Sequence, residues 1–230
     1  MPASMVNAEP CPASDMQEAP VRPVLRGWSH VIAFAMTLIA GPLLVSHAPS
    51  VGVGFALGVY VLSLAALFGV SAMLHRGRWS ARARQRMRRA DHTTIFVAIA
   101  GTYTAVAALA LNGWPMILVL CMVWLGGAAG VAMRQAWLNA PKWVVAIPYV
   151  VVGWSAIAVM PQLLHGLGGV GFGLLVAGGA SYTAGALVYA LRAPDPSPRV
   201  FGYHEVFHLL TIAGATLHFI VIAGYALPRA

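Results

Sequence analysis

The last apolar run of the chain, residues 201–227, reads FGYHEVFHLLTIAGATLHFIVIAGYAL and decides the fold. It is long enough to cross the hydrocarbon core of a membrane, which takes about 20 residues of helix. His204 and His208 lie four residues apart near its start, so both imidazoles project from one helix face. Polar groups next to lipid are costly and indicate a functional role. A pair that caps the helix or lies at the membrane interface is the alternative.

The composition of the whole chain agrees with this reading. Of 230 residues, 60% are hydrophobic and only 9% are charged, whereas ordinary soluble domains carry about 25% charged residues. The sequence therefore predicts an integral membrane protein with one membrane domain, and it excludes a soluble globular domain.

Seven apolar runs are separated by proline, glycine and asparagine, as expected for turns. Each is close to the length of a membrane helix. We expect an all-α membrane protein with a bundle of seven transmembrane helices over residues 26–230. Residues 1–25 are rich in Pro, Ala and Ser and are predicted to form a disordered N-terminal tail. The runs cover residues 27–45, 51–74, 94–111, 114–133, 143–160, 168–191 and 201–227.

The basic residues alternate between the links. The links after runs one, three and five contain no Lys or Arg, and the links after runs two, four and six do. The positive-inside rule then predicts a cytoplasmic N-terminus and an external C-terminus. The membrane topology accounts for the net charge of +8, so we expect no nucleic-acid partner. The arginine run after run two is placed to contact anionic lipid head groups. The basic residues in these links are Arg76, Arg78, Arg82, Arg84, Arg86, Arg88, Arg89, Arg134, Lys142, Arg192 and Arg199.

This topology brings four polar residues to the same depth. His75 ends run two, Asp91 precedes run three, and the two histidines begin run seven, all on the cytoplasmic side. Three neutral imidazoles with one open position are typical of a catalytic zinc site, and a nearby carboxylate can act as general base. Two alternatives remain. His75 could simply lie at the membrane interface, and Asp91 could pair with an arginine at the start of a helix, where the helix dipole favours an acidic residue.

Further polar residues are assigned weaker roles. Ser71 lies one turn before His75 and could hold a ligand or a water, or bond back to its own helix. His30 is placed to support the site, and Tyr103 to line a cavity. His218 lies about 21 Å beyond His204 along a helix, too deep to share a ligand position.

The string His204-Glu-Val-Phe-His208 also matches the metalloprotease pattern H-E-x-x-H. In that reading Glu205 is the base and a third, acidic ligand is needed nearby. No Asp or Glu follows residue 208, so only Asp91 could serve. An intramembrane protease is therefore the less favoured reading, and Glu205 remains a weak candidate.

Three segments resemble the hemolysin III family, the bacterial branch of the progestin and adipoQ receptor (PAQR) superfamily. Ser71-Ala-Met-Leu-His75 is similar to its S-x-x-x-H, and Asp91-His92 with Ala100-Gly-Thr-Tyr-Thr104 to its aspartate block. Phe201 to His208 is similar to its final H-x-x-x-H. The resemblance covers residues 26–227. Two positions depart from the family's opening E-x-x-N-x-x-T-H, namely Pro23 and Arg26, and Ala105 replaces a frequent proline.

The resemblance implies a zinc ion held by His75, His204 and His208, with Asp91 and Ser71 beside the attacking water. Relatives in the wider superfamily are thought to hydrolyse lipid amides, and bacterial members are named for haemolytic activity, a name that does not establish a pore. We therefore expect a multi-pass protein of the bacterial inner (plasma) membrane that hydrolyses amides or esters of lipid-like substrates. The alternative is a channel, transporter, sensor or cytolytic protein in which zinc is structural.

Overall fold

The computed structural model describes residues 23–230, and within this part of the chain the regular structure is entirely helical. Three short helical turns, η2 (Ser155–Val159), η3 (Ile222–Ala226) and η4 (Leu227–Arg229), extend the longer helices. The prediction of an all-α protein is confirmed. The longer helices are α1 (Trp28–Ser46), α2 (Val51–Arg76), α3 (Ala81–Ala110), α4 (Gly113–Ala136), α5 (Lys142–Gly153), α6 (Met160–Leu191) and α7 (Tyr203–Val221).

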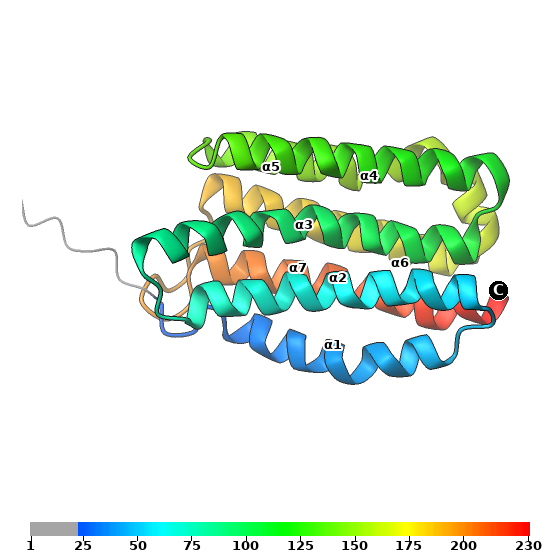
Figure 1. Cartoon of the computed structure of the whole chain (residues 1–230), viewed down its shortest axis with the longest axis horizontal. Helices are drawn as coiled ribbons and strands as arrows, with labels where there is room; N and C mark the ends of the chain where they lie inside the picture. Colours follow the sequence, from blue (N-terminus) through cyan, green and yellow to red (C-terminus); the bar gives the residue numbers. More distant parts are fainter. Residues whose placement is uncertain (1–22) are drawn as a thin grey trace, which may run out of the picture.

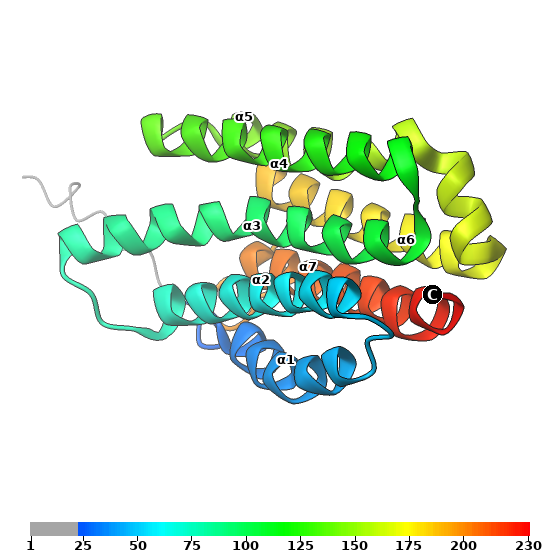
Figure 2. The ribbon, with the colours of Figure 1, turned by 45° about the vertical axis from the view of Figure 1, so that its right-hand side comes forward.

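The helices lie side by side along one long axis (Figure 1). The most extensive contacts join α2 to α3 and α6 to α7, and α1 packs on α2. Both views place the start of α7 and the end of α2 at the same end of the bundle (Figures 1 and 2). The C-terminus lies at the opposite end from the start of α1. This arrangement brings the polar ends of α2, α3 and α7 together.

Apolar side chains cover the outside of the bundle as well as its core. Six helical stretches are long and apolar enough to cross a membrane, and one of them combines α5 and α6 over 50 residues. Large side chains such as Ile39, Phe55 and Leu125 are 62%, 74% and 71% exposed. Exposed apolar surface on this scale marks a lipid-facing protein. The prediction of a helical membrane bundle is thus confirmed.

The structure differs from the predicted third run at its beginning. Helix α3 begins at Ala81 rather than near position 94, so most of the arginine-rich link is helical. The Ser80 hydroxyl caps this helix by accepting a hydrogen bond from the Ala83 amide at 3.4 Å. Arginine is a good helix former, so a dense run of basic residues continues a helix once it is capped.

The boundary between the fifth and sixth predicted runs also differs. Helix α5 ends at Gly153, and the chain continues through η2 into α6 without a long loop. Gly168 interrupts α6 with φ 70° and ψ 168°. Only glycine adopts this backbone conformation readily, and the break coincides with the start of the predicted sixth run.

The predicted disordered tail, residues 1–25, lies outside the described residues except for its last three positions. Those three are ordered. The amide of Val24 donates to the Arg199 carbonyl at 3.1 Å, and the amide of Leu25 donates to the Val200 carbonyl at 3.2 Å. The segment before α1 is therefore fixed to the link between α6 and α7, next to the start of α7.

Small residues allow the helices to approach closely. A side chain at Gly101 of α3 would collide with Ser63 of α2, and one at Gly178 of α6 would collide with His218 of α7. Close approach of this kind is typical of helix pairs in membranes. Because α6 and α7 meet at Gly178, His218 lies buried between them.

Candidate functional site

Three histidines from two helices meet at one end of the bundle. His75 is the penultimate residue of α2, and His204 and His208 lie in the first two turns of α7. One ring nitrogen of each lies within 4.8 Å of the others. The Nε2 atoms of His75 and His204 are 3.2 Å apart. The three imidazoles thus point at one position.

This geometry fits a zinc ion. Zinc binds imidazole nitrogen at about 2.0–2.1 Å in a tetrahedron, which places two ligand atoms roughly 3.3 Å apart. The distance between His75 Nε2 and His204 Nε2 matches that spacing. His208 is 2% exposed, and its Nδ1 has no hydrogen-bond partner among the described residues. Three imidazoles, of which that of His208 has a buried nitrogen without a hydrogen-bond partner, form a suitable donor set.

The predicted carboxylate lies near the trio without belonging to it. Asp91, in the third turn of α3, lines the same cavity as the three histidines but is not part of the group that can share one ion. The Ser71 hydroxyl lies beside the Asp91 carboxyl group. Ser71 is buried on α2, one turn before His75. The structure therefore brings all five predicted site residues to one cavity.

That cavity has a volume of about 360 Å³ and is lined by residues of α1, α2, α3, α5, α6 and α7 and by Arg26 in the link before α1. Its wall carries the histidine trio, Asp91 and Ser71 at one end. Towards the other end it is lined by Thr102, Tyr103, Trp154 and His218. A cavity with a few polar groups at one end and a mostly apolar wall is typical of a binding site for a small amphipathic molecule.

Glu205 is directed away from this chemistry. Its carboxylate forms an ion pair with the Arg26 side chain, and its Oε2 accepts a hydrogen bond from the Gly202 amide at 2.9 Å. The residue is 2% exposed and is not among those that line the cavity. It caps the start of α7 and fixes the segment before α1 to it. This position does not suit the general base of an H-E-x-x-H protease.

The remaining candidates take distinct places. His30 of α1 is stacked on His208, with ring centroids 3.8 Å apart and planes 10° apart. His92 Nδ1 donates to the Arg88 carbonyl at 2.7 Å, so its ring is turned back along α3. Tyr103 lines the cavity, as expected, and its hydroxyl donates to the Gly153 carbonyl at 2.6 Å.

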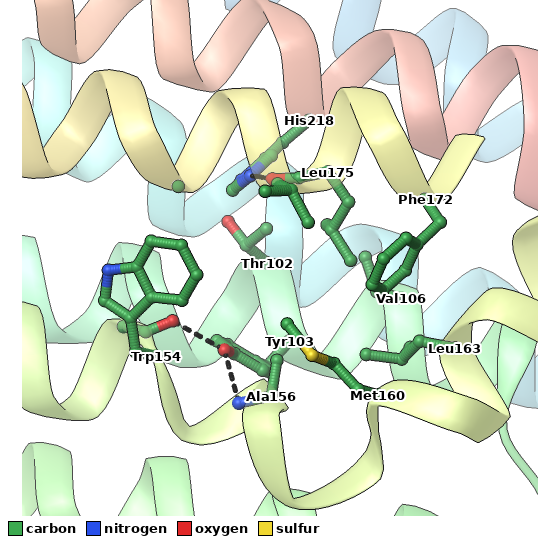
Figure 3. A pocket seen from close by; sticks show the side chains of 13 residues that line it. Thr102, Tyr103, Val106, Trp154, Ala156, Met160, Leu163, Phe172, Leu175 and His218 are labelled. Carbon is green, nitrogen blue, oxygen red and sulfur yellow. Dashed lines mark hydrogen bonds between the residues drawn. The ribbon is translucent and has the colours of Figure 1, made fainter. Parts of the chain in front are cut away.

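His218 lies far from the trio, deep in the bundle. Its Nε2 donates to the Leu175 carbonyl at 3.1 Å. The residue lines the deep part of the cavity and also an adjoining smaller pocket, which Figure 3 shows. Its Nδ1 is buried and has no hydrogen-bond partner among residues 23–230. The expectation that it is too deep to share the metal position agrees with this placement.

Several lining residues were not anticipated from the sequence. Lys142 begins α5, contacts the Tyr203 hydroxyl and lies over the rings of Tyr189 and Tyr203, at 4.7 and 4.2 Å from their centroids. Its only sequence signal was its contribution to topology. Tyr149 and Tyr189 stand in apolar runs without a motif, so nothing in the sequence distinguishes them from other tyrosines. Their role as cavity walls follows from the packing of α5 and α6.

Comparison with known proteins places the chain in a family. The family model described as haemolysin-III related matches residues 19–219. Hemolysin-3 of Bacillus cereus is 27% identical over 205 residues, covering 88% of this chain and 90% of that protein. The hemolysin-3 homolog of Bacillus subtilis (strain 168) is 28% identical over 135 residues, covering 59% of this chain and 61% of that protein. Because the family model spans most of the sequence, and with it the ends of α2 and α3 and the start of α7, this chain belongs to the haemolysin-III-related family.

Proposed function

We propose that this chain is a zinc-dependent hydrolase of lipid-like amides or esters, embedded in the bacterial inner (plasma) membrane. The observation that carries the proposal is the meeting of three histidine nitrogens at one end of a cavity that also contains Asp91 and Ser71. The cavity continues into a mostly apolar interior. Metal ligands, a carboxylate and room for an apolar chain are the parts that such a reaction needs.

We further propose seven membrane crossings, with the start of α1 in the cytoplasm and the C-terminus outside. The start of α1 and the C-terminus lie at opposite ends of the bundle, as an odd number of crossings requires. The stretch of 50 residues that combines α5 and α6 is about 75 Å long as a helix, far more than one crossing of ~30 Å. Its break between Gly153 and Gly168 allows it to return. The arginine-rich start of α3 then lies on the cytoplasmic side.

Each residue near the trio has a role in this proposal. His75, His204 and His208 would hold a zinc ion, which supplies Lewis-acid chemistry by polarising a substrate carbonyl. The Asp91 carboxylate accepts a proton from the attacking water and returns it to the leaving group. The Ser71 hydroxyl donates to that carboxylate and holds it in place. The stacked ring of His30 restricts the orientation of His208.

The proposed activity is tested with purified protein in lipid nanodiscs and a panel of acyl amides and esters, with released fatty acid measured by mass spectrometry. Wild-type protein should release fatty acid from at least one member of the panel. The Asp91→Asn variant should bind as much zinc as wild type and release none above background. A wild-type protein that contains zinc but cleaves nothing, and that carries solute flux in liposomes, would instead favour the channel or transporter with a structural metal.

A further inference from the structure

Positive side chains surround the mouth of the cavity without acidic partners. Arg84 and Arg88 of α3 and Lys142 of α5 line it beyond the histidine trio. Within residues 23–230 the side-chain ion pairs are those of Arg26 with Glu205 and His92 with Asp91, so none of these three cations has a carboxylate within 4 Å. Lys142 is held over two tyrosine rings, and an Arg88 nitrogen donates to the Leu138 carbonyl at 3.4 Å. The mouth therefore presents uncompensated positive charge to an entering molecule.

The opposite end of the cavity continues past Thr102 and Tyr103 into a smaller, mostly apolar space. A smaller cavity of about 60 Å³ shares Thr102, Tyr103, Gly153, Trp154, Gly179 and His218 with the large one, so the two lie end to end. Its other walls include Val106, Leu163 and Phe172, which close around it in Figure 3. The combined space accommodates an extended apolar chain better than a compact polar molecule.

Helix α3 runs along the full length of this space. It contributes lining residues at every turn along one face: Arg84, Arg88, Asp91, His92, Ile95, Ala98, Ile99, Thr102, Tyr103 and Val106. At 1.5 Å per residue, Arg88 and Arg84 lie about 5 and 10 Å before Asp91 along the axis, and Val106 lies about 22 Å beyond it. The reacting carbonyl, which must lie near Asp91, is thus flanked by positive charge on one side and an apolar arm on the other.

We propose that the substrate is a single-chain acyl lipid whose leaving part carries an anionic group, a carboxylate or a phosphate, close to the scissile carbonyl. This rests on the hydrolase proposed above and adds the substrate class. The acyl chain occupies the arm that ends at Val106, and the anion contacts Arg88, Arg84 and Lys142. Hydrolysis joins the water oxygen to the carbonyl carbon and breaks the bond between that carbon and the leaving nitrogen or oxygen. The leaving atom takes one proton of the water, so the products are a fatty acid, which then loses its own proton to solvent, and an amine or alcohol that carries the anionic group.

The proposal is tested by binding, which does not depend on turnover. Asp91→Asn protein in nanodiscs of neutral lipid is titrated with two matched pairs of ligands. N-palmitoylglycine is compared with uncharged N-palmitoylglycinamide, and palmitoyl lysophosphatidic acid with monopalmitoylglycerol. The first pair tests a carboxylate and the second a phosphate. Charge-assisted contacts predict that at least one anionic ligand binds about tenfold or more tightly than its neutral partner.

A charge-matched control lies on the same helix. Arg84→Gln/Arg88→Gln should reduce the preference for the anionic ligand to about threefold or less, because it removes side chains that line the mouth. Arg82→Gln/Arg86→Gln removes the same charge from exposed positions that do not line the cavity and should keep the preference. If the first pair of changes prevents folding, Lys142→Gln in the same assay should still reduce the preference. Zinc content is measured for every variant, so that a loss of the metal site is recognised.

Two outcomes would overturn the proposal: equal affinity for charged and neutral ligands, or equal loss of the preference in both double variants. Neither outcome bears on catalysis. If the wild-type protein cleaves only neutral lipids, the proposed hydrolase activity stands and the proposed anionic substrate class is wrong. If the protein prefers anionic ligands but has no hydrolytic activity, the proposed binding site is correct and the proposed reaction is wrong.

Discussion

The Nε2 atoms of His75 and His204 face each other at 3.2 Å, although 129 positions separate the two residues in the chain. Two half-buried imidazoles at this distance can share one proton or one metal ion. His208, one turn further along α7, brings a third ring to the same position, with its centroid 4.5 Å from that of His204. A third imidazole has no place in a simple proton-shared pair, whereas it completes the donor set of a zinc site.

Asp91 is predicted to act in the reaction without binding the metal. Asp91→Asn should keep about one zinc per chain, because the residue is outside the group of three ligands. Hydrolysis should fall by about 10²–10⁴-fold, the usual contribution of a general base. Ser71→Ala should reduce it less, because the hydroxyl acts through Asp91. Metal analysis and turnover are measured on the same preparations. Loss of zinc in Asp91→Asn would show instead that the carboxylate is a ligand.

Glu205 separates the proposed hydrolase from an H-E-x-x-H protease. Glu205→Gln leaves Arg26 without its partner at the start of α7, and breaking such a buried pair costs up to about 3–5 kcal/mol. The thermal unfolding midpoint of the detergent-purified protein should therefore fall. Activity per folded molecule should remain within about tenfold of wild type, because Glu205 does not line the cavity. A loss of 10³-fold or more in a variant that keeps its fold and zinc would support the protease reading.

The contact between Gly178 and His218 is predicted to limit the size of the side chain on α6. Gly178→Ala places a methyl group against the His218 ring and should destabilise the protein by about 1–3 kcal/mol, as overpacking does. Gly173→Ala on the same helix is the control, since open space surrounds that position. Thermal unfolding compares the two. Adding His218→Ala should restore part of the stability lost in Gly178→Ala, and no such recovery would mean that the clash has another origin.

The orientation of the bundle is tested by labelling single cysteines in a background with Cys11 and Cys121 changed to serine. His47, in the link after α1, and Gln85, in the arginine-rich turn of α3, are both exposed. In intact spheroplasts an impermeant maleimide should label His47→Cys but not Gln85→Cys. After permeabilisation it should label both. Labelling of Gln85→Cys in intact spheroplasts would contradict a cytoplasmic arginine segment.

The membrane helices are predictable because a run of about 20 apolar residues has few alternatives in a bilayer. The meeting of His75, His204 and His208 follows from the charge pattern, which places the end of run two and the start of run seven on the same side. The start of α3 at Ala81 is not predictable from hydropathy, because a dense run of arginines marks the cytoplasmic side in the sequence and yet continues the helix in the structure.

Contacts between distant segments were beyond the sequence pattern. The pair of Arg26 and Glu205 joins the segment before α1 to α7, and neither residue has a partner at helical spacing. Lys142 contributes to the cavity because its side chain reaches Tyr203 at the start of α7, although α5 itself packs mainly on α6. A single lysine at the end of an apolar run carries the same sequence signal whether it faces a cavity or the head groups.

The central claim is that three histidines hold one zinc ion, and the most direct measurement is the metal content of detergent-purified protein by mass spectrometry. Wild type is compared with His204→Ala/His208→Ala and with the control His47→Ala, which changes an exposed histidine away from the site. The account predicts about one zinc per chain in wild type and in the control, and none in the double variant. Wild-type protein without zinc, even after reconstitution with the metal, would contradict it, and the three imidazoles would then be polar packing residues between α2 and α7.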